Sequence, residues 1–341
     1  MAIADGWYHV TSRGIDRRAI FHDDHDRRHF LDLLGALPER FGIRIHAYVL
    51  MTNHYHVLVQ TPQGNLSQGI HWLNCSYGIW SNCRHRRVGP LYQGRFKAVV
   101  VDGEGSWALD LGRYIHLNPI RTKRMNLGKK EQKVERMGWA LPDKTEAESR
   151  VEALRAYRWS SYRAYAGYAS LPEWLTSDTL MGRLSEAKRK SPATYRRWVE
   201  EGVLDGKEES PWLKMKGGLA LGSERFLSVL RKMVKGDRRE QTPLRKLESD
   251  RTFDQVVKAV ETAKGEKWET FRDRRGDEGR DLALWLARKH CRMTLKALGD
   301  KAGGMDYLAV SKAVSRMAER LNKDRTIRQI LAKAESDMSN V

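Results

Sequence analysis

Two histidines, His54 and His56, flank a tyrosine in the stretch HYHVLVQT, residues 54–61. The stretch is rich in β-branched and aromatic residues, which predicts a strand. Side chains alternate between the faces of a strand, so both imidazoles should lie on one face and Tyr55 on the other. Imidazole is a common ligand for divalent metal ions. Two ligands are rarely enough, however, and taken alone the pair is more typical of two half-exposed histidines on a sheet face.

A second pair of functional side chains lies in RYIHLNPI, residues 113–120. Tyr114 and Asn118 are four residues apart, which predicts that they share one face of a helix, with His116 facing elsewhere. An amide oxygen can bind a hard cation, and a deprotonated phenol can attack phosphorus. With an ordinary pKa of about 10, a phenol needs a base or a metal-polarised phosphate to react at neutral pH. The alternative is a packed tyrosine and a helix-ending asparagine before Pro119.

The segments around these residues alternate between strand and helix patterns. Strands are predicted at 7–14, 43–51, 54–61 and 89–102, and helices at 23–42, 66–87 and 106–121. This order predicts an α+β fold, a ferredoxin-like antiparallel sheet with helices on one face. The charged residues 123–150 are interpreted as a linker or insertion. The aromatic and basic residues 157–167 should pack back on the sheet domain.

The chain has 341 residues and a formal net charge of +19, an excess that favours a polyanionic partner, most often nucleic acid. Its three cysteines form no C-x-x-C pair, which argues against a disulfide framework and a cysteine zinc site. The sequence contains no apolar run long enough to span a membrane and no signal-peptide pattern. A cytoplasmic, nucleoid-associated protein is the simplest expectation.

Four stretches, MTNHYHVLVQ, GPLYQGRFKAVVV, LGRYIHLNPIR and YRWSSYRAYAG, occur in this order within residues 7–167. Together they resemble the HUH single-strand transposases that use one catalytic tyrosine, and in particular the REP-associated tyrosine transposases. The resemblance implies that His54 and His56 bind a divalent metal ion, Mg²⁺ or Mn²⁺. It also implies that Tyr114 is the catalytic nucleophile and that Asn118 occupies the third ligand position.

The same resemblance implies a reaction. The tyrosine attacks a phosphodiester in single-stranded DNA, forms a 5'-phosphotyrosine link and frees a 3'-hydroxyl, and a 3'-hydroxyl later reverses the step. The family's substrates are hairpins, typically palindromic elements scattered in bacterial genomes. Two residues depart from the family pattern: Tyr55 stands where an aliphatic residue is usual, and Ser12 stands where many relatives have asparagine. The second change could alter a DNA contact.

Basic residues gather with two aromatic residues, Tyr92 and Phe96, in the stretch 82–97. Such residues neutralise phosphates and give a salt-dependent affinity, and aromatic rings can stack on unpaired bases. The alternative is that the aromatic residues belong to the core and the charges are solvated. The candidate DNA contacts in this domain are Arg13, Arg84, Arg86, Arg87, Arg95 and Lys97.

Residues 279–321 predict a second DNA-binding feature. A short helix, a turn at Gly303-Gly304 and a longer helix form the helix-turn-helix order, although generic helical bundles show the same pattern. The stretch resembles the C-terminal DNA-binding domain of the bacterial chromosomal replication initiator. Met305 and Tyr307 replace the arginine and histidine of that signature, so the fold carries over better than the base specificity. Lys312 and Arg316 are candidate phosphate contacts.

The sequence therefore predicts a catalytic domain at 1–170, a helical linker region at 171–270 without a readable motif, and a helix-turn-helix domain at 271–341. The predicted function is a metal-dependent transesterase that cleaves and rejoins hairpin-forming single-stranded DNA and binds duplex DNA through its C-terminal domain. Monomer and dimer stay open. The alternative is a DNA-binding regulator that recognises hairpins without turnover, although the proposed catalytic residues are all present. An RNA phosphodiesterase would need two His-x-Thr/Ser motifs, and only the one at His9 occurs.

Overall fold

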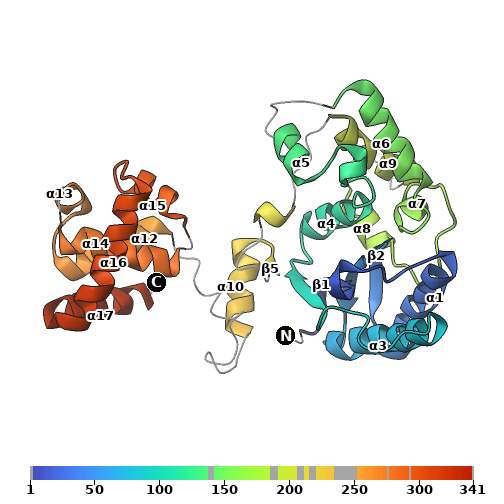
Figure 1. Ribbon diagram of the computed structural model, residues 1–341, viewed down its shortest axis with the longest axis horizontal. Helices are drawn as coiled ribbons and strands as arrows, with labels where there is room; N and C mark the ends of the chain where they lie inside the picture. Colours follow the sequence, from blue (N-terminus) through green and yellow to red (C-terminus); the bar gives the residue numbers. More distant parts are fainter. Residues whose placement is uncertain are drawn as a thin grey trace. The chain divides into compact units, whose positions relative to one another are not determined.

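The computed structural model describes residues 3–136, 142–184, 191–205, 211–214, 220–233, 252–274, 276–291 and 293–339 (Figure 1). The chain divides into two compact units. The N-terminal unit holds residues 1–215 and 219–232, and the C-terminal unit holds residues 216–218 and 233–341. Within the described parts of the chain, every helix is too short or too polar to cross a membrane.

The N-terminal unit is built on a five-stranded sheet with the order β2-β3-β1-β4-β5. Strands β1 (Gly6–Arg13), β2 (Arg44–Met51), β3 (His54–Thr61) and β4 (Lys97–Val101) pair antiparallel. Because β3 lies between β1 and β2, the first three strands form the expected split β-α-β arrangement. A short strand, β5 (Ala220–Leu221), adds to the edge of β4 in parallel. The predicted α+β class is confirmed.

Helices cover both faces of this sheet, whereas we expected them on one (Figure 1). On one face, Tyr55 packs against Phe30 of α1 (Asp24–Gly35) and donates a 2.8 Å hydrogen bond to Asn74 of α3 (Leu66–Arg84), with α2 (Leu37–Phe41) beside them. On the other face, α4 (Trp107–His116) packs against β2 and β3. The reason is that β2 and β3 bury consecutive residues rather than alternate ones, so both of their faces must be covered.

The charged stretch 123–150 is not a simple linker, which corrects our interpretation. It contains the 3₁₀ turn η2 (Lys123–Met125), α5 (Lys129–Arg136) and the first half of α6 (Lys144–Ala156), and residues 137–141 lie outside the described residues. Arg150, which is 1% exposed, donates a 2.9 Å hydrogen bond to Glu135. Buried Ala147, Val151 and Leu154 have helical spacing, which the surrounding charges hid in the sequence.

Residues 157–167 pack back on the sheet, as predicted, and they do so along its open edge. The backbone N–H of Leu50 donates to the carbonyl of Trp159 at 2.8 Å, and the hydroxyl of Tyr157 donates to the carbonyl of Leu50 at 2.6 Å. Tyr165, in α7 (Tyr162–Tyr165), donates to the carbonyl of His46 at 2.6 Å. An edge strand exposes unpaired backbone groups, and this segment satisfies those of β2.

The region 171–270, which we expected to be a helical linker, contributes described elements to both units. Those of the N-terminal unit are α8 (Asp178–Met181), α9 (Pro192–Asp205), the 3₁₀ turn η3 (Pro211–Lys214), β5 and α10 (Glu224–Met233). Residues 185–190, 206–210, 215–219 and 234–251 lie outside the described residues. The N-terminal unit therefore continues past the predicted boundary at residue 170.

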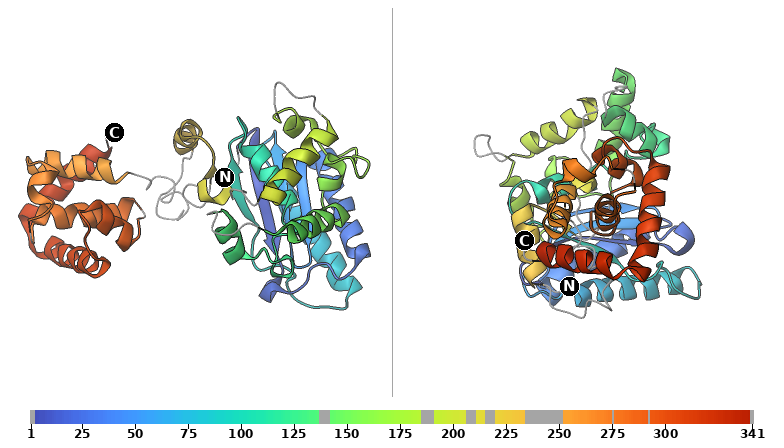
Figure 2. Two further views of the ribbon diagram at one scale, coloured as in Figure 1. Left: turned by 90° about the horizontal axis from the view of Figure 1, so that it is seen from above. Right: turned by 90° about the vertical axis from the view of Figure 1, so that its left-hand side faces the viewer.

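In its described residues the C-terminal unit consists of helices and their connections (Figure 2). They are α12 (Phe253–Lys264), α13 (Trp268–Phe271), α14 (Glu278–His290), α15 (Leu295–Lys301), α16 (Tyr307–Lys323) and α17 (Arg325–Ser339). The turn between α15 and α16 contains Gly303 and Gly304 with φ of 89° and 83°. A side chain at Gly299 would meet the carbonyl oxygen of Met305, because the turn closes tightly on α15. A helix, a tight turn and a second helix are thus present, and their use as a DNA-binding motif stays a prediction.

Candidate active site

His54 and His56 lie on the face of β3 that α4 covers, with their ring centroids 5.0 Å apart. Tyr55 points to the opposite face and is fully buried there, as the alternation of a strand predicts. His54 is half-buried and His56 is buried. The strand therefore presents two neighbouring imidazoles to the space between the sheet and α4.

A chain of hydrogen bonds fixes the ring of His54. The amide nitrogen of Asn53 donates to the carbonyl of Arg17 at 2.8 Å, so the amide oxygen of Asn53 faces His54. This oxygen lies 2.7 Å from Nδ1 of His54 and can only accept, so Nδ1 carries the proton. The lone pair of His54 is then on Nε2, which is the nitrogen left to bind a metal ion.

The ring of His56 is held from the neighbouring strand β1. Nδ1 of His56 lies 2.8 Å from Nε2 of His9, and the two rings are nearly parallel, at 17°, with centroids 5.0 Å apart. His9 is 3% exposed. Both histidines of β3 thus have Nδ1 in contact with a protein group, and Nε2 is the ring nitrogen that these contacts leave unoccupied.

Burial keeps these imidazoles neutral. It lowers the pKa of His9 to about 3 and that of His56 well below the ordinary value, where His9, His54 and Arg13 add to the effect. Burial, and after it the nearby charge of Arg13, lowers the pKa of His54 to about 4. Only the neutral form of imidazole has a lone pair to donate to a metal ion, so burial preserves this lone pair well below neutral pH.

Helix α4 brings Tyr114 to the histidines. Its ring is edge-on to His56 with centroids 6.3 Å apart, and the guanidinium of Arg121 lies 4.5 Å from the centre of the phenol ring. Asn118 follows the end of α4, and its amide nitrogen donates to the carbonyl of Tyr114 at 2.9 Å. The structure thus brings His54, His56 and Tyr114 together and ties Asn118 to the same turn of chain as Tyr114.

Trp212 is a residue of this region that the sequence did not reveal. It lies in η3, edge-on to Tyr114 with centroids 5.2 Å apart, and its ring is tilted against His9 at 4.8 Å. The sequence offers only a single tryptophan in the stretch SPWLK, almost a hundred residues after Tyr114, with no sign that the chain returns to the sheet there. β5, close behind η3 in the sequence, provides the physical link, because it pairs with β4.

His116 faces away from this cluster, as predicted. Its Nδ1 lies 2.7 Å from the hydroxyl of Tyr195 in α9, and its Nε2 lies 2.7 Å from Oγ of Ser161. It is fully buried, and burial lowers its pKa to about 3. His116 therefore joins α4, α7 and α9 rather than taking part in the candidate site.

The predicted DNA contacts of the N-terminal unit fall into two groups. Lys97 pairs with Thr11, which pairs with His56, and Arg13 pairs with His54, so Arg13 and Lys97 lie on the histidine face of the sheet. Arg84 instead forms ion pairs with Asp23, at 2.7 Å, and with the buried Asp26, and so joins α3 to the start of α1. The remaining candidates, Arg86, Arg87 and Arg95, are exposed or half-buried in the loop between α3 and β4.

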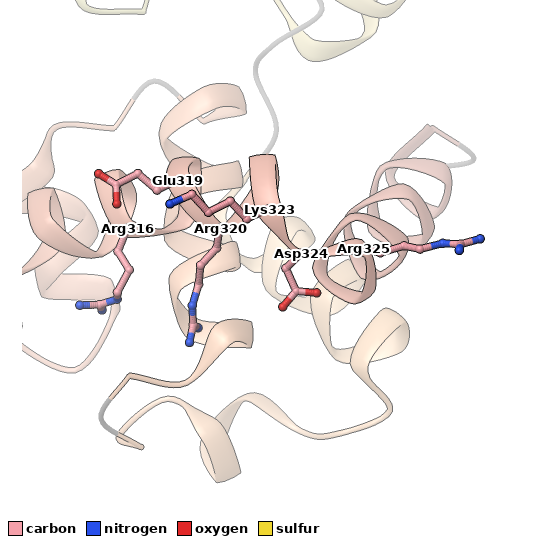
Figure 3. A pocket seen from close by; sticks show the side chains of 6 residues that line it. All are labelled: Arg316, Glu319, Arg320, Lys323, Asp324 and Arg325. Atoms are coloured by element: carbon pink, nitrogen blue, oxygen red, sulfur yellow. The ribbon is translucent and has the colours of Figure 1, made fainter.

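The two C-terminal candidates also differ. Lys312 is exposed on α16, whereas Arg316 forms an ion pair with the fully buried Asp281 of α14, with Nη2 and Oδ2 2.6 Å apart. A cavity of about 480 Å³ lies where α16 ends and α17 begins (Figure 3). It is lined by Arg316, Glu319, Arg320, Lys323, Asp324 and Arg325.

The N-terminal unit is thus an α+β domain in which a pair of imidazoles on a sheet lies next to a tyrosine on a helix. Residues 2–118 match the family model of IS200-like transposases. The resemblance to single-strand transposases is confirmed for this part of the chain, and it indicates a transposase-like role in processing DNA. The likeness of the C-terminal unit to a replication initiator stays a prediction.

A solved structure of a REP-associated tyrosine transposase bound to a REP hairpin is 16% identical to this chain, with a TM-score of 0.34. That match covers 52% of this chain and 90% of the other. No curated protein matches the sequence.

Proposed function

We propose that this protein is a metal-dependent, tyrosine-nucleophile DNA transesterase that cleaves and rejoins hairpin-forming single-stranded DNA. The observation that carries the proposal is the approach of Tyr114, on a separate element of the fold, to His56, whose ring lies beside that of His54. This combination suits attack on phosphorus, because it sets a nucleophilic oxygen beside groups that can hold a phosphate-binding cation.

In the proposed reaction, the hydroxyl oxygen of Tyr114 attacks a phosphodiester in line with the 3'-oxygen. A bond forms between phosphorus and the tyrosine oxygen, and the bond between phosphorus and the 3'-oxygen breaks. The phenol releases its proton to water and the departing 3'-oxygen takes one up. The product is a 5'-phosphotyrosine and a free 3'-hydroxyl, and a 3'-hydroxyl can reverse the step without ATP because the phosphodiester energy is kept in the tyrosine link.

The donor groups fit Mg²⁺ or Mn²⁺. Nε2 of His54 and of His56 would supply two ligands, and the amide oxygen of Asn118 a third. The amide of Asn118 is proposed as the third ligand because it is tied to the same turn of chain as Tyr114. When bound, the ion would polarise the phosphate and offset charge that develops on it.

DNA binding is proposed to use the two kinds of basic surface. Arg13 and Lys97 flank the histidines on the same face of the sheet and suit the phosphates beside the cleavage point. Arg86, Arg87 and Arg95 would contact the hairpin further along. The C-terminal unit would bind duplex DNA through α16, with Lys312 as a phosphate contact. A cytoplasmic, nucleoid-associated location goes with this proposal.

The test is incubation of the full chain with labelled single-stranded hairpins from the flanks of its gene, with Mn²⁺ or Mg²⁺. We expect a covalent protein–DNA adduct that Tyr114→Phe removes, a loss of at least about 10³-fold. His54→Ala should lower adduct formation strongly. The matched control is Tyr307→Phe, which removes an exposed hydroxyl of the C-terminal unit and should leave the adduct unchanged.

An adduct that persists in Tyr114→Phe would contradict the assignment of the nucleophile. A different result, tight hairpin binding with no adduct in the unaltered chain, would favour a regulator that grips hairpins without turnover. The contact of Trp212 with Tyr114 is the observation behind this second candidate, because a ring packed against the phenol can hinder the approach of a phosphate.

A further inference from the structure

His9 is a buried titratable group that the proposed reaction leaves without a task. It lies on β1, on the same face of the sheet as His56, since its neighbour on that face, Thr11, pairs with His56. Its ring and that of His56 are nearly parallel, with an interplanar angle of 17° and centroids 5.0 Å apart, and Nε2 of His9 meets Nδ1 of His56 at 2.8 Å. The contact is thus a hydrogen bond between two imidazoles, of which only one faces the proposed metal ion.

The direction of this hydrogen bond decides whether His56 can be a ligand. A neutral imidazole carries one proton, and the nitrogen without the proton is the one that binds a metal ion. If His9 donated, the proton of His56 would sit on Nε2 and would block that nitrogen. If His9 accepts, the proton of His56 sits on Nδ1, and the lone pair of Nε2 points at the ion.

We propose that His9 is a positioning residue of the metal site: its Nε2 accepts the Nδ1 proton of His56, and so fixes both the tautomer and the orientation of that ligand. The inference rests on the metal site of the proposed function. His9 stands behind the ligand rather than beside the ion, in agreement with the absence, among the described residues, of a metal-binding group of three such side chains.

His54 shows the same arrangement with a different acceptor. Its Nδ1 proton goes to the amide oxygen of Asn53, which the carbonyl of Arg17 holds in place. Each proposed histidine ligand therefore has an acceptor of its own behind it. An acceptor behind a histidine ligand raises the basicity of the ligand nitrogen, and its removal typically weakens metal binding about 10- to 100-fold.

Two substitutions at His9 distinguish the loss of the hydrogen-bond acceptor from the loss of the ring's volume. In His9→Gln the side-chain amide oxygen can take the place of Nε2 and still accept. In His9→Phe a ring of similar size remains but accepts nothing. Tyr8→Phe is the matched control, because it removes a buried hydroxyl from the same strand on the opposite face, where that hydroxyl accepts a hydrogen bond from the backbone of Ile3.

The experiment is a titration of the full-length protein with Mn²⁺, followed by the electron paramagnetic resonance of the free ion, without DNA. We expect His9→Phe to bind Mn²⁺ about 10- to 100-fold more weakly, and His9→Gln and Tyr8→Phe to stay within about threefold of the unaltered protein. Nitrogen-15 spectra of the metal-free protein should show a protonated Nδ1 on His56, a signature that depends on the tautomer and not on folding.

Each outcome has one meaning. Equal Mn²⁺ affinity of His9→Phe and the unaltered protein would overturn the role of His9 and leave the proposed function intact. A proton on Nε2 of His56 would overturn the role of His9 and would also remove that nitrogen as a ligand of the metal-free protein, which counts against the metal site of the proposed function as well. Equal weakening in His9→Gln, His9→Phe and Tyr8→Phe would assign the loss to the strand and not to the acceptor, which also overturns it. If the unaltered protein bound no Mn²⁺, the metal site of the proposed function itself would fail.

Discussion

Both units of this protein bury carboxylates that pair with arginine, Glu135 with Arg150 in the N-terminal unit and Asp281 with Arg316 in the C-terminal unit, but they differ in the histidines that they bury. The N-terminal unit buries neutral imidazoles: His9, His46 and His116 are at most 3% exposed. In its described residues the C-terminal unit buries paired carboxylates but no histidine: Asp281 is fully buried against Arg316, and Asp277, at 6% exposed, pairs with Lys264 at 3.0 Å and caps the start of α14. His290 is the only histidine after residue 116. The units should therefore respond differently to pH and to loss of a polar partner.

For His9 the proposed metal site offers a reason for this difference. A metal site made of imidazoles works only while the rings are neutral, and a dry, apolar setting keeps them so. The cost is that the same setting penalises protonation. A helical unit with basic surface helices has no such need, and it can use a guanidinium or an ammonium to neutralise a buried carboxylate.

The largest expected effect is a selective loss of stability of the N-terminal unit in mild acid. Burial lowers the pKa of His9 and His116 to about 3 and that of His46 to about 4. Below about pH 6.5 the unfolded chain takes up protons that the folded unit cannot, so stability present above this pH is lost as the pH falls toward 3 to 4. Each histidine should contribute a loss of about 2 kcal/mol by pH 5.

The measurement is pulse proteolysis in urea at pH 7.5 and pH 5.0, with a chelator present and with the cleaved segments mapped by mass spectrometry. Between pH 7.5 and pH 5.0, the urea concentration at which half of the N-terminal unit is cleaved should fall strongly. The corresponding concentration for the C-terminal unit should fall much less. Equal falls in both units would show that the buried histidines do not set the difference.

The second effect is the loss of a single buried imidazole. His116→Ala leaves a cavity and deprives the hydroxyls of Tyr195 and Ser161 of a partner, so the N-terminal unit should lose about 3 kcal/mol of unfolding free energy. The number of protons taken up on unfolding in mild acid should also fall by about one, so the unfolding free energy should depend less on pH. Urea unfolding at the two pH values measures both quantities.

The control for this prediction is His71→Ala, because His71 is an exposed histidine of α3. It should change the unfolding free energy by less than about 0.5 kcal/mol. A similar loss in the two variants would remove the distinction between buried and exposed histidines on which the comparison of the units depends.

Local patterns in the sequence predicted the parts of the site that lie on one element. Alternation along β3 placed His54 and His56 together and Tyr55 on the opposite face, and helical spacing turned His116 away from Tyr114. These relations hold because they depend on the geometry of a single strand or helix. The turn of helix that carries Tyr114 and Asn118 was found for the same reason.

Contacts between distant segments could not be predicted in this way. Trp212 reaches Tyr114 through a return of the chain to the sheet, and His9 supports His56 from another strand. Arg84 was expected to bind DNA but pairs with Asp26, 58 residues earlier in the chain. A charge pattern reveals an excess of basic residues, but not which of them already have a carboxylate partner.

The smallest predicted effect concerns two basic residues of the C-terminal unit, of which Arg316 has a carboxylate partner and Lys312 is exposed. Lys312→Ala should weaken binding of the full chain to a duplex by about threefold to tenfold and lower the slope of log affinity against log salt by about 0.9. The unfolding free energy of the Lys312→Ala variant should equal that of the unaltered protein, because Lys312 is exposed. Arg316→Ala should instead cost about 2 to 3 kcal/mol in the unfolding of the C-terminal unit, because it leaves Asp281 buried without its partner.

Fluorescence anisotropy with a labelled duplex at several salt concentrations measures the first quantity, and urea unfolding measures the second. Lys333→Ala, at an exposed position of α17, is the control for charge alone and should leave the slope unchanged. If Lys312→Ala and Lys333→Ala lowered the slope equally, duplex binding would reflect the net charge of the unit rather than α16. If Arg316→Ala lowered the salt slope without loss of stability, Arg316 would be a phosphate contact despite its ion pair. The carboxylate of Asp281 would then be stable in the core without its partner.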